Sequence, residues 1–438
     1  MATIPGDVDA DRGPPLSIPL RHFVAALGFL LAGSALGVAD AFGVASGLAR
    51  LAHLHLLLVG FVCLTIAGAM TQFVPVWSGT ALYSRRLARA QLWLIAGGVG
   101  AFAAALLTNR LAALPAGGGL MLAGFWTFAY NVGRTLAAAR PLDVTERHFA
   151  IALAFVVALT ALGVVLAVGF VTPVFGAAVA RPAAVATHAT LAVFGAVLTT
   201  VFGALYQLVP MFGQTDLDAL DRRLQRVETV AYPVGVVVLA AGRLLRSAPM
   251  ARLGALLLLA GVLAFVVVLS RRLRDARAER TPMLVRYALL APTLLCWALV
   301  TLPAWLHTPL APAARFGAPG TTHLLAVIVV LVLVGTLYHV VPFLVWLHRY
   351  ADRLGVEAVP MIDDLYDDRL ATVDLALVAG GGALLVVGEW TGGGTVARVG
   401  GGGLAVGLAV FAANLSLVVW RHAPDALRRE STPATGSD

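Results

Sequence analysis

The chain has 438 residues, of which 60% are hydrophobic and 12% are charged, and its mean hydropathy is +0.88. A soluble domain carries about twice this fraction of charged residues, so the composition excludes an ordinary soluble protein. The formal net charge is +8, and every basic residue is an arginine. The two cysteines, Cys63 and Cys296, lie in apolar stretches. They are interpreted as small core residues, not as a disulfide or a cysteine metal site.

Twelve apolar blocks follow one another along the chain, and each is long enough to cross a bilayer. They cover residues 20–43, 52–77, 88–108, 112–138, 148–170, 184–212, 227–245, 250–270, 283–305, 321–347, 371–390 and 396–420. The sequence therefore predicts an all-α, polytopic membrane protein with twelve transmembrane helices. The membrane domain is expected over residues 20–420, between an N-terminal tail (1–19) and a C-terminal tail (421–438).

One pattern occurs three times, in the second, sixth and tenth of these blocks. Each copy has a proline, a glycine seven residues before it and a histidine 19 to 22 residues before it; the glycine–proline pairs are Gly68 and Pro75, Gly203 and Pro210, and Gly335 and Pro342. The prolines are 135 and 132 residues apart, which corresponds to four blocks. The sequence predicts three pseudo-symmetric four-helix repeats, at about 20–140, 148–272 and 283–420, with the second helix of each nearest the axis.

The arginines are distributed unequally between the two sides of the predicted membrane domain. The side reached by the odd-numbered connections has only eight, namely Arg50, Arg110, Arg181, Arg243, Arg246, Arg252, Arg315 and Arg398. The other 23, including the cluster from Arg271 to Arg280, belong to the even-numbered connections and the two termini. Because arginine is enriched on the cytoplasmic side of membrane proteins, both termini are expected in the cytoplasm of a prokaryotic cell, below its plasma membrane.

The histidines of the repeated pattern are the candidate cofactor ligands. They are His53, His55, His188 and His323, and this topology places them near the outer ends of their helices. Ionisable residues at membrane depth are costly and usually functional, and imidazole is a ligand for haem iron and copper. Counted from the prolines, His55 and His323 differ by one residue, about 1.5 Å of helical rise. His53 and His55 point about 200° apart, so they cannot both face one haem.

Two of these segments resemble haem–copper oxidase subunit I. The segment from His53 through Gly68 to Pro75 is similar to the second helix of that family, which carries a low-spin haem ligand near its outer end. The stretch from His323 to Pro342 is similar to its tenth helix. The resemblance implies one low-spin, b-type haem between spans two and ten, ligated by His323 and by His53 or His55. It also implies a small redox protein or a quinol as electron donor.

The chain departs from that family at the oxygen-reducing centre. The family needs three histidines there, from spans six and seven, whereas this chain has His188 in span six and none in span seven. The expectation is therefore a haem protein that lacks the copper and high-spin haem centre and acts in electron transfer or in O2 or NO chemistry. If it is an enzyme, the expected class is a respiratory oxidoreductase.

Two alternatives are left open. The segment from His53 to Gly79 also resembles the second helix of the NnrS family, twelve-span haem- and copper-containing proteins linked to nitric oxide tolerance. That resemblance implies copper on the His53 and His55 side. The other alternative is a transporter without a cofactor, since internal repeats also occur in transporters. The expected partner is the lipid bilayer, no nucleic-acid partner is expected, and the oligomeric state is left open.

The sequence indicates no chemical role for several polar residues near the predicted inner face. His22 and His148 are interpreted as interface residues that flank their spans. His339 is expected to have a packing role. Glu228 and Asp374 are placed near the inner ends of their helices, so that no acidic residue is expected in the middle of the membrane.

Overall fold

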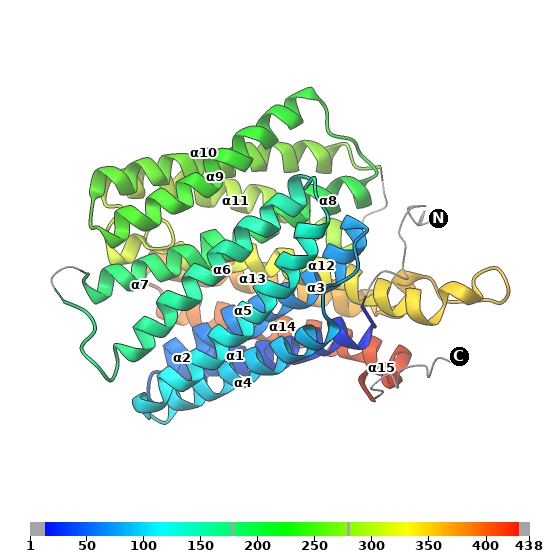
Figure 1. Ribbon diagram of the computed structural model, residues 1–438, viewed down its shortest axis with the longest axis horizontal. Helices are drawn as coiled ribbons and strands as arrows, with labels where there is room; N and C mark the ends of the chain where they lie inside the picture. Colours follow the sequence, from blue (N-terminus) through cyan, green and yellow to red (C-terminus); the bar gives the residue numbers. More distant parts are fainter. Residues whose placement is uncertain (1–13, 177–178, 278–280, 429–438) are drawn as a thin grey trace.

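The computed structural model describes residues 14–176, 179–277 and 281–428. Most of the predicted N-terminal tail, the last ten residues and the end of the Arg271–Arg280 cluster lie outside these ranges. The described residues form helices and connecting loops, with no β-strand (Figure 1). Twelve of the helices are long and apolar enough to cross a membrane, which confirms the predicted all-α, twelve-span fold class.

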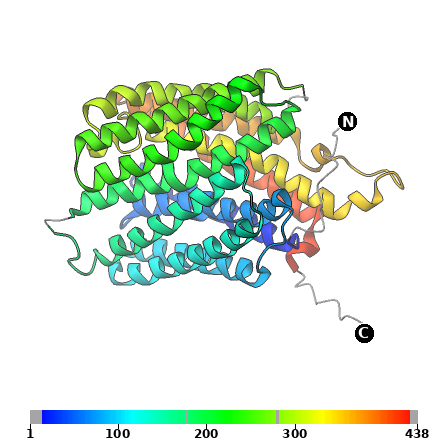
Figure 2. The ribbon, with the colours of Figure 1, turned by 45° about the horizontal axis from the view of Figure 1, so that its top comes forward.

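The spans follow one another in an antiparallel bundle (Figures 1 and 2). In chain order they are α1 (Ser17–Ala41), the continuous helix of α2 (Ala49–His55), η2 (Leu56–Cys63) and α3 (Leu64–Ser78), α4 (Arg85–Leu107), α5 (Leu114–Ala138), α6 (Val144–Val168), the continuous helix of α7 (Arg181–Thr190), η4 (Leu191–Leu198) and α8 (Thr199–Gly213), α9 (Ala219–Leu244), α10 (Ala248–Arg274), α11 (Pro282–His307), α12 (Thr322–Arg349), α13 (Asp368–Thr391) and α14 (Gly394–His422). Short helices lie between or beyond them: η3 (Leu111–Ala113), η5 (Pro312–Ala314), η6 (Ala351–Arg353), η7 (Ile362–Leu365) and α15 (Pro424–Arg428).

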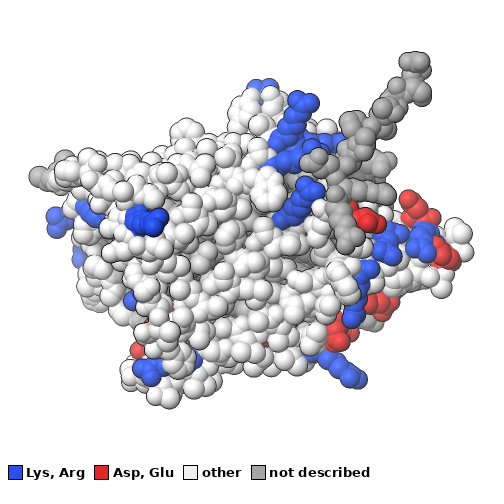
Figure 3. All heavy atoms as spheres, turned by 90° about the horizontal axis from the view of Figure 1, so that it is seen from below, with Lys and Arg blue, Asp and Glu red and all other residues white. Residues whose placement is uncertain are grey.

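The charged side chains gather toward the two ends of the bundle, and Figure 3 shows a wide band between them that is almost free of charge. The first and last described helices meet at one end, where Arg21 of α1 donates a hydrogen bond to the carbonyl oxygen of Leu427 in α15 at 3.1 Å. This end, toward which the even-numbered spans run, is called the arginine-rich end below. The band without charges is the surface expected to face lipid.

The second helix of each predicted repeat lies deep in the bundle. In their apolar windows, 78% of the residues of the sixth span and 72% of those of the tenth are buried. Residues of α3, α8 and α12 line one central cavity of about 60 Å³; among them are Met70, Val201 and Leu333. This common cavity agrees with the prediction that these helices lie near an axis. The threefold arrangement itself stays a prediction, which superposition of the three four-helix groups tests.

Glycines bring the third and fourth helices of each group together. A Cβ atom built on Gly98 of α4 would lie 2.7 Å from the backbone nitrogen of Met121 in α5. A Cβ atom built on Gly235 of α9 would lie 2.3 Å from a backbone nitrogen of α10. A Cβ atom built on Gly381 of α13 would lie 2.4 Å from a backbone nitrogen of α14. Small residues therefore allow backbone-to-backbone packing at the same place in all three groups.

This packing predicts a sharp difference between two neighbouring glycines of α4. Gly98→Val would force backbone apart and should destabilise the protein by roughly 1–3 kcal/mol, the usual cost of overpacking. Gly97→Val should have little effect, because a Cβ atom at Gly97 meets nothing within 4 Å. Thermal unfolding of the two variants in detergent compares them directly. Equal melting temperatures would contradict the packing described here.

Two spans contain a π-helical segment that the sequence analysis did not predict. Residues Leu56–Cys63 in span two and Leu191–Leu198 in span six are π-helical, whereas α12 in span ten is α-helical throughout. Each π segment lies immediately after, or within three residues of, a candidate histidine. Such segments are rare and are frequently found at functional sites.

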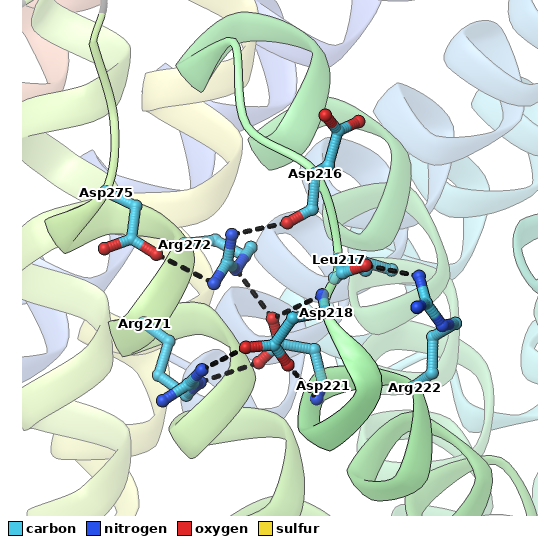
Figure 4. Close-up of polar contacts among 8 residues, drawn as sticks. All are labelled: Asp216, Leu217, Asp218, Asp221, Arg222, Arg271, Arg272 and Asp275. Atoms are coloured by element: carbon cyan, nitrogen blue, oxygen red, sulfur yellow. Dashed lines mark hydrogen bonds and ion pairs between the residues drawn. The ribbon is translucent and has the colours of Figure 1, made fainter.

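At the arginine-rich end, α9 begins eight residues earlier than predicted, at Ala219. Asp218 caps it: its side chain accepts a hydrogen bond from the backbone of Asp221, and the Asp221 side chain accepts one from the backbone of Asp218. Arg271 of α10 contacts both carboxylates, at 2.5 and 2.8 Å, and Arg272 contacts Asp221 at 2.9 Å (Figure 4). The cap explains why a charged segment continues the helix beyond its apolar part.

The Asp218 cap predicts a loss of local order in acid. The Asp221 backbone N–H and the Arg271 guanidinium hold the pKa of Asp218 below its ordinary value. Because the folded pKa is the lower one, the stabilisation is present above the ordinary value of 3.8 and is lost as the pH falls through the folded value. Hydrogen exchange at the first turn of α9 should therefore accelerate below about pH 4. Asp218→Asn keeps a capping side chain without the charge. In this variant, hydrogen exchange at the first turn of α9 should show no acceleration from protonation of residue 218.

Candidate functional site

His55 and His188 line the same cavity, away from the arginine-rich end. The cavity has a volume of about 440 Å³ and lies between spans two, three, four, five and six. Its walls are mainly aliphatic and aromatic, with Phe102, Met121 and Phe125 among them. A mainly apolar cavity of this size with a few convergent polar groups is typical of a cofactor or ligand site.

Each of these two histidines is held by a backbone carbonyl through one ring nitrogen. Nδ1 of His55 lies 2.9 Å from the carbonyl oxygen of Leu51, and Nδ1 of His188 lies 3.0 Å from that of Leu159 in α6. A donated Nδ1–H fixes the neutral tautomer in which Nε2 carries a lone pair. Metal-ligating histidines are almost always oriented in this way by their other ring nitrogen.

The packing around the two rings depends on small and aromatic neighbours. A Cβ atom at Gly163 would lie 3.0 Å from Cε1 of His188, so the glycine leaves room for that imidazole. His55 contacts the Phe102 ring, with centroids 4.8 Å apart. The adjacent π segments end the regular α-helical register just beyond both histidines. The rings are therefore positioned by tertiary contacts in addition to their helices.

Two arginines stand at the mouth of the cavity. Arg181, at the start of α7, lies over the Phe170 ring at 4.2 Å and donates a hydrogen bond to the carbonyl oxygen of Leu166. Arg315, which follows η5, also lines the cavity, and its buried Nε has no hydrogen-bond partner within the described residues. Burial lowers the pKa of Arg315. An arginine Nε–H without a partner on the wall of an apolar cavity fits a ligand that carries a carboxylate.

The other two candidate histidines, His53 and His323, do not line this cavity. Nδ1 of His53 is 2.7 Å from the carbonyl oxygen of Gly33 in α1, and Gly37 leaves room for the imidazole. His323, at the start of α12, is 38% exposed, and its Nδ1 lies 2.7 Å from Glu389 of α13. Span two therefore presents His55 to the cavity that His188 also lines, and His53 to span one.

Within residues 14–176, 179–277 and 281–428, no group of three or more His, Cys, Asp or Glu side chains has the spacing to hold a metal ion. Any metal bound by the described histidines would thus have one or two protein ligands from each pair. Two axial imidazoles suit the iron of a haem, since the porphyrin supplies the other four ligands.

Two histidines near the arginine-rich end are placed differently from the sequence-based interpretation. His22 and His148 are buried, with exposed fractions of 0% and 1%, and do not lie at the interface. They pack against the repeated glycines Gly68 and Gly203, and each bonds a side chain of the third span in its group. In the sequence, the signal for these buried contacts is a polar residue at a similar place in each of those third spans. His339 is partly buried and its ring contacts those of Phe212 and Phe343, in agreement with its predicted packing role.

In comparisons with known proteins, no family model matches the chain, and no curated protein matches it. The class that fold and composition define is a polytopic, twelve-span membrane protein.

Proposed function

We propose that this membrane protein binds a b-type haem in the cavity between spans two and six, with His55 and His188 as axial ligands, and that it acts in electron transfer or in O2 or NO chemistry. The observation that carries the proposal is the pair of imidazoles on one 440 Å³ cavity, each with Nδ1 held by a carbonyl and Nε2 left to ligate. The architecture is also the one that the resemblance to haem–copper oxidase subunit I implies.

The residues present fit the group. A bound haem would supply one-electron redox chemistry at its iron. His55 and His188 would hold it from two helices, apolar side chains such as Phe125 would exclude water, and Arg315 would meet a carboxylate at the mouth. If both imidazoles held the haem, the group would supply electron transfer rather than direct gas binding.

A second pairing, His53 with His323, supports a narrower alternative. Nδ1 of His53 is held by the carbonyl oxygen of Gly33, and Glu389 lies 2.7 Å from Nδ1 of His323. This pair matches the haem site between spans two and ten that the family resemblance implies, and equally the copper of an NnrS-like protein. His53 and His55 face different sides of the helix, so both pairs can coexist in one chain.

An absorption spectrum of the purified protein, reduced minus oxidised, tests the proposal. A low-spin b-type haem gives sharp α and β bands on reduction, and copper analysis of the same sample then separates haem alone from haem with copper. A protein purified from haem-sufficient cells without these bands would contradict haem binding and favour a transporter without a cofactor.

The unequal distribution of arginines predicts that the arginine-rich end faces the cytoplasm of a prokaryotic cell. A reporter enzyme that is active only in the cytoplasm should therefore be active when fused to the C-terminus. The same reporter inserted between α13 and α14 should be inactive. The reverse result would place the histidine cavity on the cytoplasmic side.

A further inference from the structure

Three polar clusters occupy equivalent places near the arginine-rich end of the bundle. In each, a side chain of the first helix of a group lies against the repeated glycine of the second helix and contacts a polar side chain of the third helix. The clusters are His22 with Gln91 and Thr71, His148 with Glu228 and Tyr206, and Arg286 with Asp374 and Tyr338. The residue of the first helix also bonds the carbonyl oxygen four residues earlier in every case.

The first and third clusters need no additional proton between their side chains. His22 can donate its Nδ1–H to the carbonyl oxygen of Ile18 at 2.8 Å and accept a hydrogen bond from the Gln91 amide at 3.3 Å, so both residues stay neutral. Arg286 and Asp374 form a buried ion pair. Because arginine does not give up its proton in proteins, this pair is permanently charged.

The second cluster requires a mobile proton. Nδ1 of His148 lies 2.7 Å from the carbonyl oxygen of Val144, which has no proton, so Nδ1 must be the donor. Nε2 then lies 3.0 Å from a carboxylate oxygen of Glu228, and two lone pairs at that distance would repel. One proton must lie between them, either on the imidazole or on the carboxyl group, and the pair is neutral overall in both arrangements.

The titratable and charged groups around this pair come from α6, α8 and α9. The ring of Tyr206 in α8 lies 5.7 Å from that of His148, with its hydroxyl buried beside Glu228. Tyr232, one turn further along α9, also interacts with Glu228, and Arg147 is the nearest cation to His148. His148 and Glu228 are 1% and 0% exposed. The proton is therefore held in a nearly solvent-free environment.

A polar path leads from this pair to the arginine-rich end. Along α9, Asp221, Gln225 and Glu228 follow at spacings of four and three residues, so they share one face, and all three are buried. Asp221 belongs to the capping network of Figure 4. A separate cavity of about 10 Å³ between α8 and α10 is lined by Tyr206, Leu217 and Arg272.

We propose that the His148–Glu228 pair is a proton-binding site that exchanges its proton with the arginine-rich end of the protein along the Asp221–Gln225 face of α9. Of the three equivalent clusters within the described residues, it is the one whose chemistry requires a transferable proton. Protonation moves between Nε2 of His148 and a carboxylate oxygen of Glu228 without creating a net charge in the interior. The proposal does not depend on haem binding.

Infrared spectroscopy with transfer from H2O to D2O tests this site. The wild-type protein should show an exchangeable band of the shared proton that is lost in Glu228→Gln. That variant is expected to fold, because it reproduces the His22–Gln91 pair that the chain already contains. Gln225→Leu should keep the band and slow its exchange. Gln91→Glu, the reciprocal change, should create a second band.

The outcomes separate a proton site from a purely structural one. If Glu228→Gln removes no exchangeable band, or if the Glu228 band persists in D2O while surface groups have exchanged, the pair only ties the helices together and the proposal is wrong. If Gln225→Leu exchanges at the wild-type rate, the route along α9 is wrong. Should Glu228→Gln not fold, the ¹⁵N signals of His148 in the wild-type protein, identified by their absence in His148→Gln, report the same proton.

Discussion

His188→Ala and His55→Ala are each expected to abolish the low-spin haem spectrum of the purified protein. Loss of either imidazole leaves the iron with one axial ligand, which removes the strong-field pair that low-spin character requires. The structural reason for choosing these two is the shared cavity and the carbonyl contacts of both Nδ1 atoms. The measurement is the reduced spectrum, normalised to protein, after expression in haem-sufficient cells.

His323→Ala is the matched control for this prediction. His323 lies on the other side of span two, beside Glu389, so its loss should leave the spectrum of the cavity haem intact. If His323→Ala and His53→Ala remove the low-spin bands while His188→Ala keeps them, the haem lies between spans two and ten. The original pairing implied by the family resemblance would then be the correct one.

Asp374→Ala is expected to destabilise the protein severely. It would leave the Arg286 guanidinium buried without its carboxylate, and breaking a buried pair in this way typically costs about 3–5 kcal/mol. The same change removes the acceptor of the Tyr338 hydroxyl. The expected result is a large loss of folded protein and a lower melting temperature in detergent.

The double variant Arg286→Met with Asp374→Leu tests whether the cost comes from the unpaired charge. Removing both charges should recover most of the lost stability, since apolar replacement of a buried pair is often close to neutral. A double variant as unstable as Asp374→Ala would mean that Arg286 stabilises mainly through its other bonds, to the carbonyl oxygens of Pro282 and Ala371.

The twelve spans could be predicted because they depend on composition alone: each needs about 20 apolar residues. Their ends depend on local chemistry. The early start of α9 comes from the reciprocal cap of Asp218 and Asp221, which holds a charged segment in a helix before the apolar part begins. The π segments could not be predicted, because the shift of the hydrogen-bond ladder depends on the helices packed around it.

The recurrence of the histidines along the sequence identifies them as candidates, but it does not predict the direction in which each side chain points. Counting from the prolines to His53, His55 and His188 passes through a π segment, whereas counting to His323 does not. The two kinds of helix differ in rotation per residue, so equal counts do not give equal directions. For this reason the sequence could pair residues by depth, while the structure places His55 on the cavity that His188 also lines and His53 against α1.

The buried pair of His148 and Glu228 was missed for a different reason. Each residue lies near a helix end, where charged side chains normally reach water. Only the packing of His148 against Gly203, and of α9 against α6 and α8, removes them from solvent. The useful sequence signal was the repetition of a polar residue in the third helix of each group, at Gln91, Glu228 and Asp374.

An experimental density map of the protein purified with its bound cofactor tests the central claim most directly. We expect planar porphyrin density in the cavity between spans two and six. Nε2 of His55 and Nε2 of His188 should bind its iron, and a carboxylate should lie at Arg315. If the sample contains haem but the cavity shows only lipid or solvent density, with both imidazoles unligated, the proposed haem site is wrong.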